Sequence, residues 1–143
     1  MPVQKLREIM RDILQMTEQI LRAGEPPIDR QHLADLRKNV ALAYNVFFAE
    51  QERLLLQPLR QSGEPALAAI ARSCVDRDLE GRQGGLEHYQ RWTLARIDED
   101  PAGYRADVRK VLDWIEARTL FAEQIAYPAL TRLISSAKRP SAD

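Results

Sequence analysis

Apolar residues recur at three- and four-residue spacing along most of the chain, which is the period of one face of an α-helix. The apolar runs are separated by residues that stop or start helices: Gly24 with Pro26 and Pro27, the turn 61–65, and Asp100 with Pro101. No segment alternates apolar and polar residues over a length that suits a strand. The pattern therefore predicts an all-α protein, with helices over about 6–21, 30–58, 65–92 and 101–133.

Short connections between long helices favour antiparallel neighbours, so we expect an antiparallel up-down-up-down four-helix bundle. We expect a single domain over residues 1–135 and a flexible polar tail over 136–143. A chain of 143 residues can form a sufficient core without disulfides or metal. Bundles build their sites in the core from facing helices, so the informative residues are the polar ones that interrupt the apolar stripes.

Composition excludes several classes of function. The chain has 21 basic and 21 acidic residues, so no excess positive charge attracts nucleic acid or an anionic membrane. No run approaches the roughly 20 apolar residues of a membrane span. The single cysteine, Cys74, excludes an internal disulfide and fits a reducing compartment, and the opening MPVQKLREIMRD has no apolar signal core. We expect a cytoplasmic protein that binds neither nucleic acid nor membranes.

Charged residues interrupt three of the predicted apolar stripes. Glu52 falls in a stripe of the second helix, Asp78 and Arg82 lie four apart in the third, and Arg118 lies in the fourth with Glu123 at its border. A buried charge costs several kcal/mol unless it is paired or liganded. Two interpretations stay open for each residue. Either it meets a partner in the core, or it turns to the rim with its stem on apolar surface.

The tetrapeptide FAEQ occurs at 48–51 and at 121–124, and each copy is followed by a proline, Pro58 or Pro128. When the prolines are aligned, the two copies are offset by three residues, so we interpret the tetrapeptide itself as coincidence. The positions counted back from the prolines are more informative. Phe48 and Arg118 stand ten residues before them, Glu52 stands six before Pro58, and Glu123 stands five before Pro128.

This arrangement resembles the hemerythrin-like (HHE cation-binding) family, a four-helix bundle that holds two irons through five histidines and bridging carboxylates. The resemblance covers about residues 33–134, including Tyr127-Pro128-Ala129-Leu130 and the turn before Leu67. It implies that Phe48 and Arg118 occupy histidine positions, that Glu52 and Glu123 occupy carboxylate positions, and that Asp78 and Arg82 stand where a pair of histidines is expected. In the first helix, Arg7 and Met10 are the candidates for a ligand position.

The chain has only two histidines, His32 and His88, and neither lies at a motif position. Imidazole is the usual neutral iron donor, whereas a phenyl ring donates nothing and a guanidinium repels a cation. The resemblance therefore implies a degenerate member with no di-iron cofactor. We hypothesise that Arg82 and Arg118 replace the irons electrostatically and neutralise Glu52, Asp78 and Glu123. In the alternative, Glu52, Asp78 and Glu123 still bind iron or another divalent metal.

The expected function is a non-catalytic binding, sensory or assembly module whose partner is an unknown protein, a small molecule or a second copy in a homodimer. The alternative is residual metal binding. A third reading, histidine phosphotransfer through His32, has little support because Gln31-His32-Leu33 lacks the small residues expected after such a histidine. The sequence shows no set of nucleophile, base and orienting group, so we do not expect an enzyme.

Three glycines, Gly81, Gly84 and Gly85, fall inside the third helical pattern. A glycine in a helix costs roughly 1 kcal/mol relative to alanine, so each should have a structural reason. One interpretation is a kink or break in the middle of the helix. The other is a close approach to a neighbouring helix, a partner or a ligand.

Overall fold

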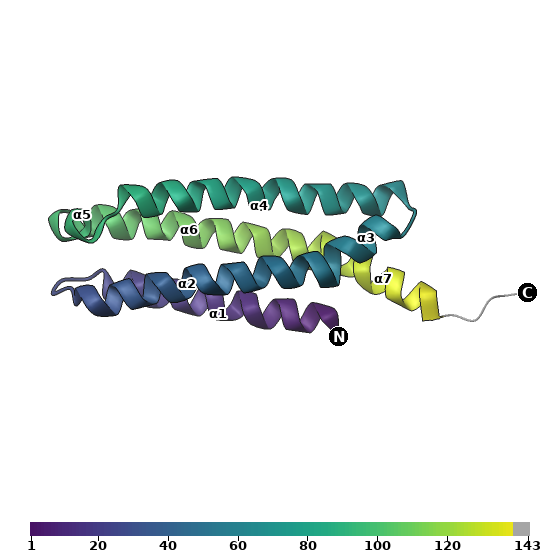
Figure 1. Ribbon diagram of the computed structural model, residues 1–143, viewed down its shortest axis with the longest axis horizontal. Coiled ribbons are helices and arrows are strands. Elements are labelled where there is room, and N and C mark those ends of the chain that lie inside the picture. The colour runs from purple at the N-terminus through teal and green to yellow at the C-terminus, as the bar shows by residue number, and fades with distance from the viewer. Residues whose placement is uncertain (139–143) are drawn as a thin grey trace, which may run out of the picture.

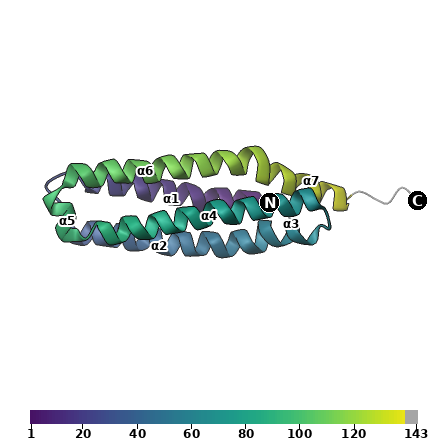
Figure 2. The same cartoon turned by 90° about the horizontal axis from the view of Figure 1, so that it is seen from above.

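The computed structural model describes residues 1–138, which fold into long helices packed together, with no strand among them. The predicted all-α class is confirmed. Successive long segments run in opposite directions and lie side by side (Figures 1 and 2). The elements are α1 (Pro2–Ala23), α2 (Arg30–Gln51), the π-helical turn η1 (Glu52–Leu56), α3 (Gln57–Gln61), α4 (Pro65–Arg91), α5 (Leu94–Glu99), α6 (Pro101–Phe121), the π-helical turn η2 (Ala122–Ala126) and α7 (Tyr127–Lys138).

The helices begin where the sequence places capping residues. Asp29 accepts a hydrogen bond from the backbone N–H of His32 at 3.1 Å, and Asp100 accepts one from Gly103 at 3.0 Å. Pro65 and Pro101 are the first residues of α4 and α6. The short helix α5 was not predicted, because six residues are too few to show a helical period.

The described residues end within the expected C-terminal tail. The helix α7 continues to Lys138, three residues past the predicted end of the domain at residue 135. Residues 139–143 of the expected flexible tail lie outside the described residues. Within residues 1–138, no helix is both long and apolar enough to cross a membrane.

The two helices that contain Pro58 and Pro128 widen before the proline instead of ending there. A proline inside a helix has no N–H, and its ring clashes with the carbonyl four residues earlier. The backbone N–H of Gln57 bonds to the carbonyl of Glu52, and that of Tyr127 bonds to the carbonyl of Ala122, in each case five residues back. Both π turns begin six residues before their proline, so the two stretches are structurally equivalent although their FAEQ copies are not.

The apolar core divides into two clusters along the length of the molecule. Thr17 lies on α1 between Ile13 of the first cluster and Ile20 of the second, and its buried hydroxyl donates to the carbonyl of Ile13 at 2.8 Å. The first cluster includes Leu6, Ile13, Phe47, Leu55, Leu59, Ile115 and Leu130. The second cluster includes Ile20, Leu33, Leu36, Trp92, Ile97, Tyr104 and Val108.

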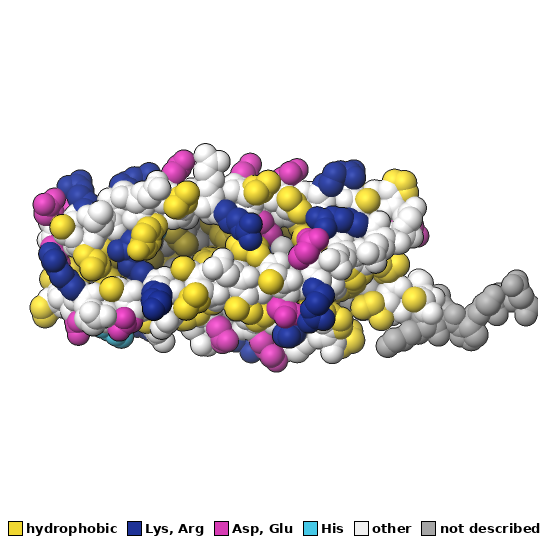
Figure 3. Space-filling view, viewed as in Figure 1, with side chains coloured by type: hydrophobic (Ala, Val, Ile, Leu, Met, Phe, Trp, Pro, Cys, Tyr) yellow, Lys and Arg dark blue, Asp and Glu magenta, His cyan; other side chains and the backbone are white. Residues whose placement is uncertain are grey.

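The glycines of α4 have two different environments. The helix is continuous from Pro65 to Arg91, so it has no break at the glycines. Gly81 lies against Trp114 of α6, and a Cβ placed on it would come within 2.0 Å of the indole ring. Gly84 and Gly85 have nothing within 4 Å of that position, although Gly85 lies seven residues after the buried Asp78 on the same helix face. The molecule is hollowed between α4 and α2, with apolar side chains in the hollow (Figure 3).

Gly81→Ala should destabilise the fold by about 2 kcal/mol, because the added methyl group forces the Trp114 ring out of place. Gly84→Ala is the matched control. It should stabilise by up to about 1 kcal/mol, because alanine favours the helix and meets no neighbour. Urea unfolding followed by circular dichroism measures the stability of both variants. If Gly81→Ala stabilised the protein as Gly84→Ala does, the packing of Trp114 would not require glycine at position 81.

Candidate functional site

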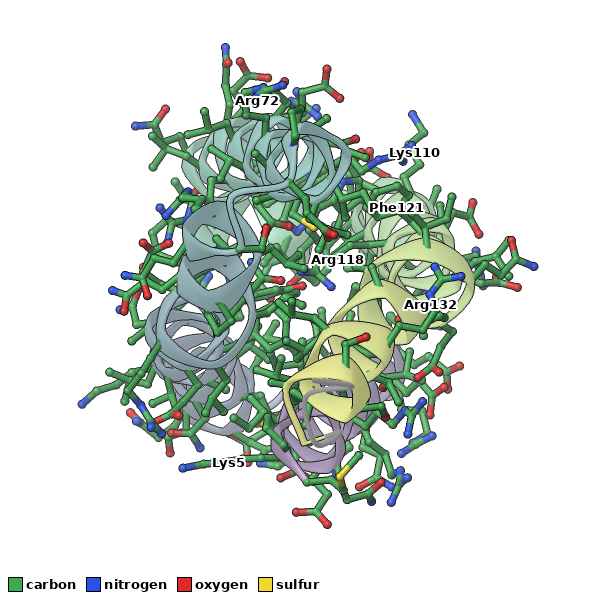
Figure 4. The ribbon with its side chains drawn as sticks, turned by 90° about the vertical axis from the view of Figure 1, so that its right-hand side faces the viewer. Lys5, Arg72, Lys110, Arg118, Phe121 and Arg132 are labelled. Carbon is green, nitrogen blue, oxygen red and sulfur yellow. The ribbon has the colours of Figure 1, made fainter. Side chains whose placement is uncertain are left out.

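Three helical segments each contribute one polar side chain to a closed, buried network. Arg118 of α6 donates from Nε to Asp78 Oδ1 at 2.7 Å and from Nη2 to Asp78 Oδ2 at 3.3 Å. Gln51, the last residue of α2, donates from Nε2 to Asp78 Oδ2 at 2.6 Å. Nη2 of Arg118 also donates to Gln51 Oε1. Figure 4 shows the Arg118 side chain directed into the middle of the bundle.

These side chains are in the core because each follows the apolar face of its own helix. Arg118 comes three residues after the buried Ile115, and Asp78 comes four residues after the buried Cys74. The exposed fractions are 2% for Gln51, 5% for Asp78 and 6% for Arg118. Burial of a charge pair is tolerated only when its hydrogen-bonding groups are satisfied, and here charge-assisted bonds satisfy both carboxylate oxygens.

The surroundings of the network are apolar and tightly packed. The ring of Phe47 lies under the Arg118 guanidinium, with 4.6 Å between the guanidinium carbon and the ring centroid. The space around the network, which Cys74 also lines, leaves no room for a water molecule. Burial raises the pKa of Cys74 to about 11 and that of Tyr44 to about 12, although the positive charge of Arg118 acts against both shifts. The thiol is therefore protonated and unreactive at neutral pH.

The structure brings only two of the six predicted site residues together in the core. The predicted pairing of Arg118 with a carboxylate is confirmed at Asp78. Glu52 and Glu123 are not part of this network. Glu52 is half-exposed and accepts from Nη1 of Arg60 at 2.5 Å.

Glu123 is held by Arg7, which was a candidate for the ligand position of the first helix. Nε and Nη2 of Arg7 each donate to a different oxygen of Glu123, both at 2.7 Å. These hydrogen bonds hold the pKa of Glu123 below its ordinary value, against the opposing effect of burial. The other candidate, Met10, is an apolar core residue of the first cluster.

Arg82 and Phe48 contact each other instead of the network. Arg82 is exposed, and its guanidinium carbon lies 3.8 Å from the centroid of the Phe48 ring. Phe48 stacks on Tyr44 with 6.0 Å between the ring centroids. The hypothesis that Arg82 neutralises a buried carboxylate is therefore wrong. It fails because the exposed side chain of Arg82 can reach water while its charge rests on the face of the Phe48 ring.

Sequence reasoning missed Gln51 because the two possible core faces of α2 differ by one residue. The stripe Tyr44, Phe48, Glu52 and the stripe Tyr44, Phe47, Gln51 both have helical spacing, and both continue to Leu55. The structure buries Phe47 and Gln51. Within η1, both Leu55 and Leu56 are buried.

A second polar cluster lies in the other half of the molecule, around Asp107 of α6. Its Oδ2 is 2.7 Å from Nδ1 of His88 and accepts from Nε1 of Trp92 at 2.9 Å and from Nη1 of Arg91 at 3.1 Å. His88, which the sequence left without a partner, thus has one, and it stacks on Tyr104. Burial raises the pKa of Asp107, but the hydrogen bonds from His88 and Trp92 outweigh it and bring the pKa below its ordinary value.

The donors do not fit a di-iron centre of the kind that the resemblance implies. Each of the three candidate carboxylates is engaged by a different guanidinium: Glu52 by Arg60, Asp78 by Arg118 and Glu123 by Arg7. Among residues 1–138, no three His, Cys, Asp or Glu side chains are grouped so that they could hold one ion. No protein-family model, curated protein or solved structure matches the chain.

Arg118→Met should lower the free energy of unfolding by about 3 kcal/mol, because it leaves the Asp78 carboxylate buried without its cation. Arg82→Met is the matched control, since it removes the same charge from an exposed cation–π contact. It should cost less than about 1 kcal/mol. Urea denaturation of both variants measures the difference.

The double variant Arg118→Met/Asp78→Leu should be more stable than Arg118→Met alone, because no unpaired charge then remains in the core. If the double variant lost as much free energy of unfolding as the two single variants together, Arg118 and Asp78 would act independently. The unpaired charge would then not be the reason why Arg118→Met is destabilising.

Asp107→Asn should destabilise the protein by about 1–2 kcal/mol at neutral pH, because the amide cannot reproduce the charge-assisted bonds to His88, Trp92 and Arg91. A lowered folded-state pKa stabilises the fold above the ordinary aspartate value of 3.8, and this contribution is lost as the pH falls below that value. The difference between wild type and variant should therefore shrink in acid. Urea unfolding of both proteins between pH 7 and pH 3 measures this difference in stability. A difference that stays constant over that range would contradict the prediction.

Proposed function

We propose that this protein is a hemerythrin-like, up-down-up-down four-helix bundle in which an ion pair stands in place of the metal centre, and that it acts as a non-catalytic binding or assembly module. The observation that carries the proposal is the guanidinium of Arg118, hydrogen-bonded to Asp78 and Gln51 in the core. In the resemblance to that family, position 118 is a histidine ligand position. The antiparallel order of the long helices supports the same topology.

Electrostatics supports the loss of metal at this position. Two unit charges 4 Å apart repel by roughly 4 kcal/mol at an effective dielectric constant of 20, and a divalent cation doubles that figure. The carboxylate that would offset this repulsion, Asp78, is already neutralised by Arg118. The network therefore provides the cross-link between helices that a metal would otherwise provide, and it offers no vacant donor to an ion.

A binding or assembly role is supported by the large apolar side chains that remain exposed. Leu79 and Leu86 lie seven residues apart on α4, so they share a face, and Tyr89 follows one turn later. Leu42 and Val46 of α2 and Leu120 of α6 are also more than half exposed. Apolar groups gathered at a surface favour a protein partner, a small molecule or a second copy of the chain. A cytoplasmic location suits the free, buried Cys74.

Metal analysis tests the proposal. The chain is expressed in medium supplemented with iron, manganese and zinc, purified without chelator and measured by inductively coupled plasma mass spectrometry. We expect far less than one ion of any of these metals per chain, and no oxygen-dependent absorption band after addition of ferrous iron under anaerobic conditions followed by air.

Near-stoichiometric iron that Glu52→Gln, Asp78→Asn or Glu123→Gln removes would instead establish the alternative, residual metal binding through the surviving carboxylates. Glu116→Gln, which changes an exposed carboxylate of α6, is the control for loss of metal by a general effect on charge.

A further inference from the structure

A groove of about 230 Å³ opens between α1 and the segment α6–η2, on the side of Arg118 away from the packed space around the network. Its volume equals that of about eight water molecules, at roughly 30 Å³ each. It is smaller than the roughly 300 Å³ and more that drug-sized ligands occupy. The groove therefore suits a small molecule that is partly open to solvent.

One side of the groove is apolar. Met10 and Leu14 of α1 line it and are four residues apart on the same helix face, and Ala122 faces them from η2. Leu14 is half-buried, so part of its side chain is available to a ligand. Apolar contact on this side would stabilise a bound hydrocarbon or aryl group.

More basic than acidic side chains line the groove, although the charge of Arg118 is balanced from the core by Asp78. Arg7, Arg11 and Arg118 line it, and Glu123 is its only acidic residue among residues 1–138. Arg7 and Glu123 neutralise each other through their two hydrogen bonds. Arg11 forms no ion pair within residues 1–138, so its charge is left for a ligand.

One end of the Arg118 guanidinium is not engaged by Asp78 or Gln51. Its Nε and Nη2 are directed to those two residues, whereas Nη1 donates to neither, and the guanidinium lies within hydrogen-bonding range of the Tyr127 hydroxyl. The residue is 6% exposed, so its orientation is set by the core and does not have to be fixed when a ligand binds. Tyr127 also lines the groove. Burial raises the pKa of its hydroxyl, and the positive charge of Arg118 and a hydrogen bond with Arg118 oppose that rise.

We propose that this groove binds a small organic anion, with a carboxylate between Arg11 and the Nη1 end of Arg118 and an apolar body against Met10 and Leu14. The inference deepens the proposed binding role and rests on it, because it names the ligand class that the bundle would bind. A buried guanidinium that is already oriented favours an anion over a neutral molecule of the same shape, since little conformational entropy is lost on binding.

Isothermal titration calorimetry with three probes of equal chain length tests the charge requirement on the full chain. We expect octanoate to bind at least about ten-fold more tightly than octanol, which corresponds to one charge-assisted hydrogen bond. Octylammonium should bind more weakly than octanol. Equal binding of all three would reduce the groove to an apolar surface, and absence of octanoate binding at millimolar concentration would overturn the proposal.

Variants locate the site. Arg11→Gln should weaken octanoate binding by about ten-fold and leave octanol binding unchanged. Arg22→Gln, the same change on the same helix at an exposed residue that does not line the groove, should have no effect. Leu14→Trp should abolish binding of both probes by filling the groove. Circular dichroism confirms that each variant is folded, and octanoate binding that is insensitive to Arg11→Gln and Leu14→Trp would place the ligand elsewhere.

The two proposals fail in different measurements. Stoichiometric metal would overturn the proposed function whatever octanoate does, because the groove residues Arg11 and Leu14 are not among the candidate metal ligands. If the protein contained no metal and did not bind octanoate, the proposed metal-free bundle would stand, and only the proposed ligand class would be wrong.

Discussion

The guanidinium of Arg118 is the one cation buried in the described part of the chain, and the structure around it is arranged to satisfy it. It reaches from α6 to Asp78 on α4 and to Gln51 at the end of α2, so a single side chain connects three helical segments. A buried charge without a partner costs several kcal/mol, which makes the positions of the three helices interdependent. The packing of Phe47 under the guanidinium and the exclusion of water around it follow from the same requirement.

The π turns determine which side chains can reach that cation. Each one adds a residue to its helix before a proline, and the added residue turns the following side chains to a new face. Gln51 stands immediately before η1 and Arg118 four residues before η2, so both belong to the regular part of their helices. Glu52 and Glu123 fall within the π turns, and both face arginines near the surface.

The two sides of Arg118 have different consequences. On the side of Asp78 and Gln51, its hydrogen bonds stabilise the fold. Toward α1 the same guanidinium borders a groove with an apolar wall and an unpaired Arg11 among the described residues. A residue held by its own network is a preorganised anion-binding group, because its position costs nothing further when a ligand arrives. The guanidinium that we propose in place of a metal is therefore also the group that we propose as a binding site for an organic anion.

The sequence by itself determined the all-α class and the starts of the long helices at Asp29, Pro65 and Pro101, because capping residues and a 3.6-residue period are local properties. It left open whether Arg118 and Asp78 lie in the core or at the rim, and the structure places both in the core. Only the tertiary structure decided which charge meets which. Two stripes of α2 that are one residue apart have the same helical spacing, so the pattern alone does not distinguish Glu52 from Gln51. The structure buries Phe47, and Gln51 lies on the same face. Arg82 remained outside, over the ring of Phe48 on α2, and Gly81 was required by Trp114 of another helix. Contacts between distant segments depend on the relative placement of whole helices, which no local pattern contains.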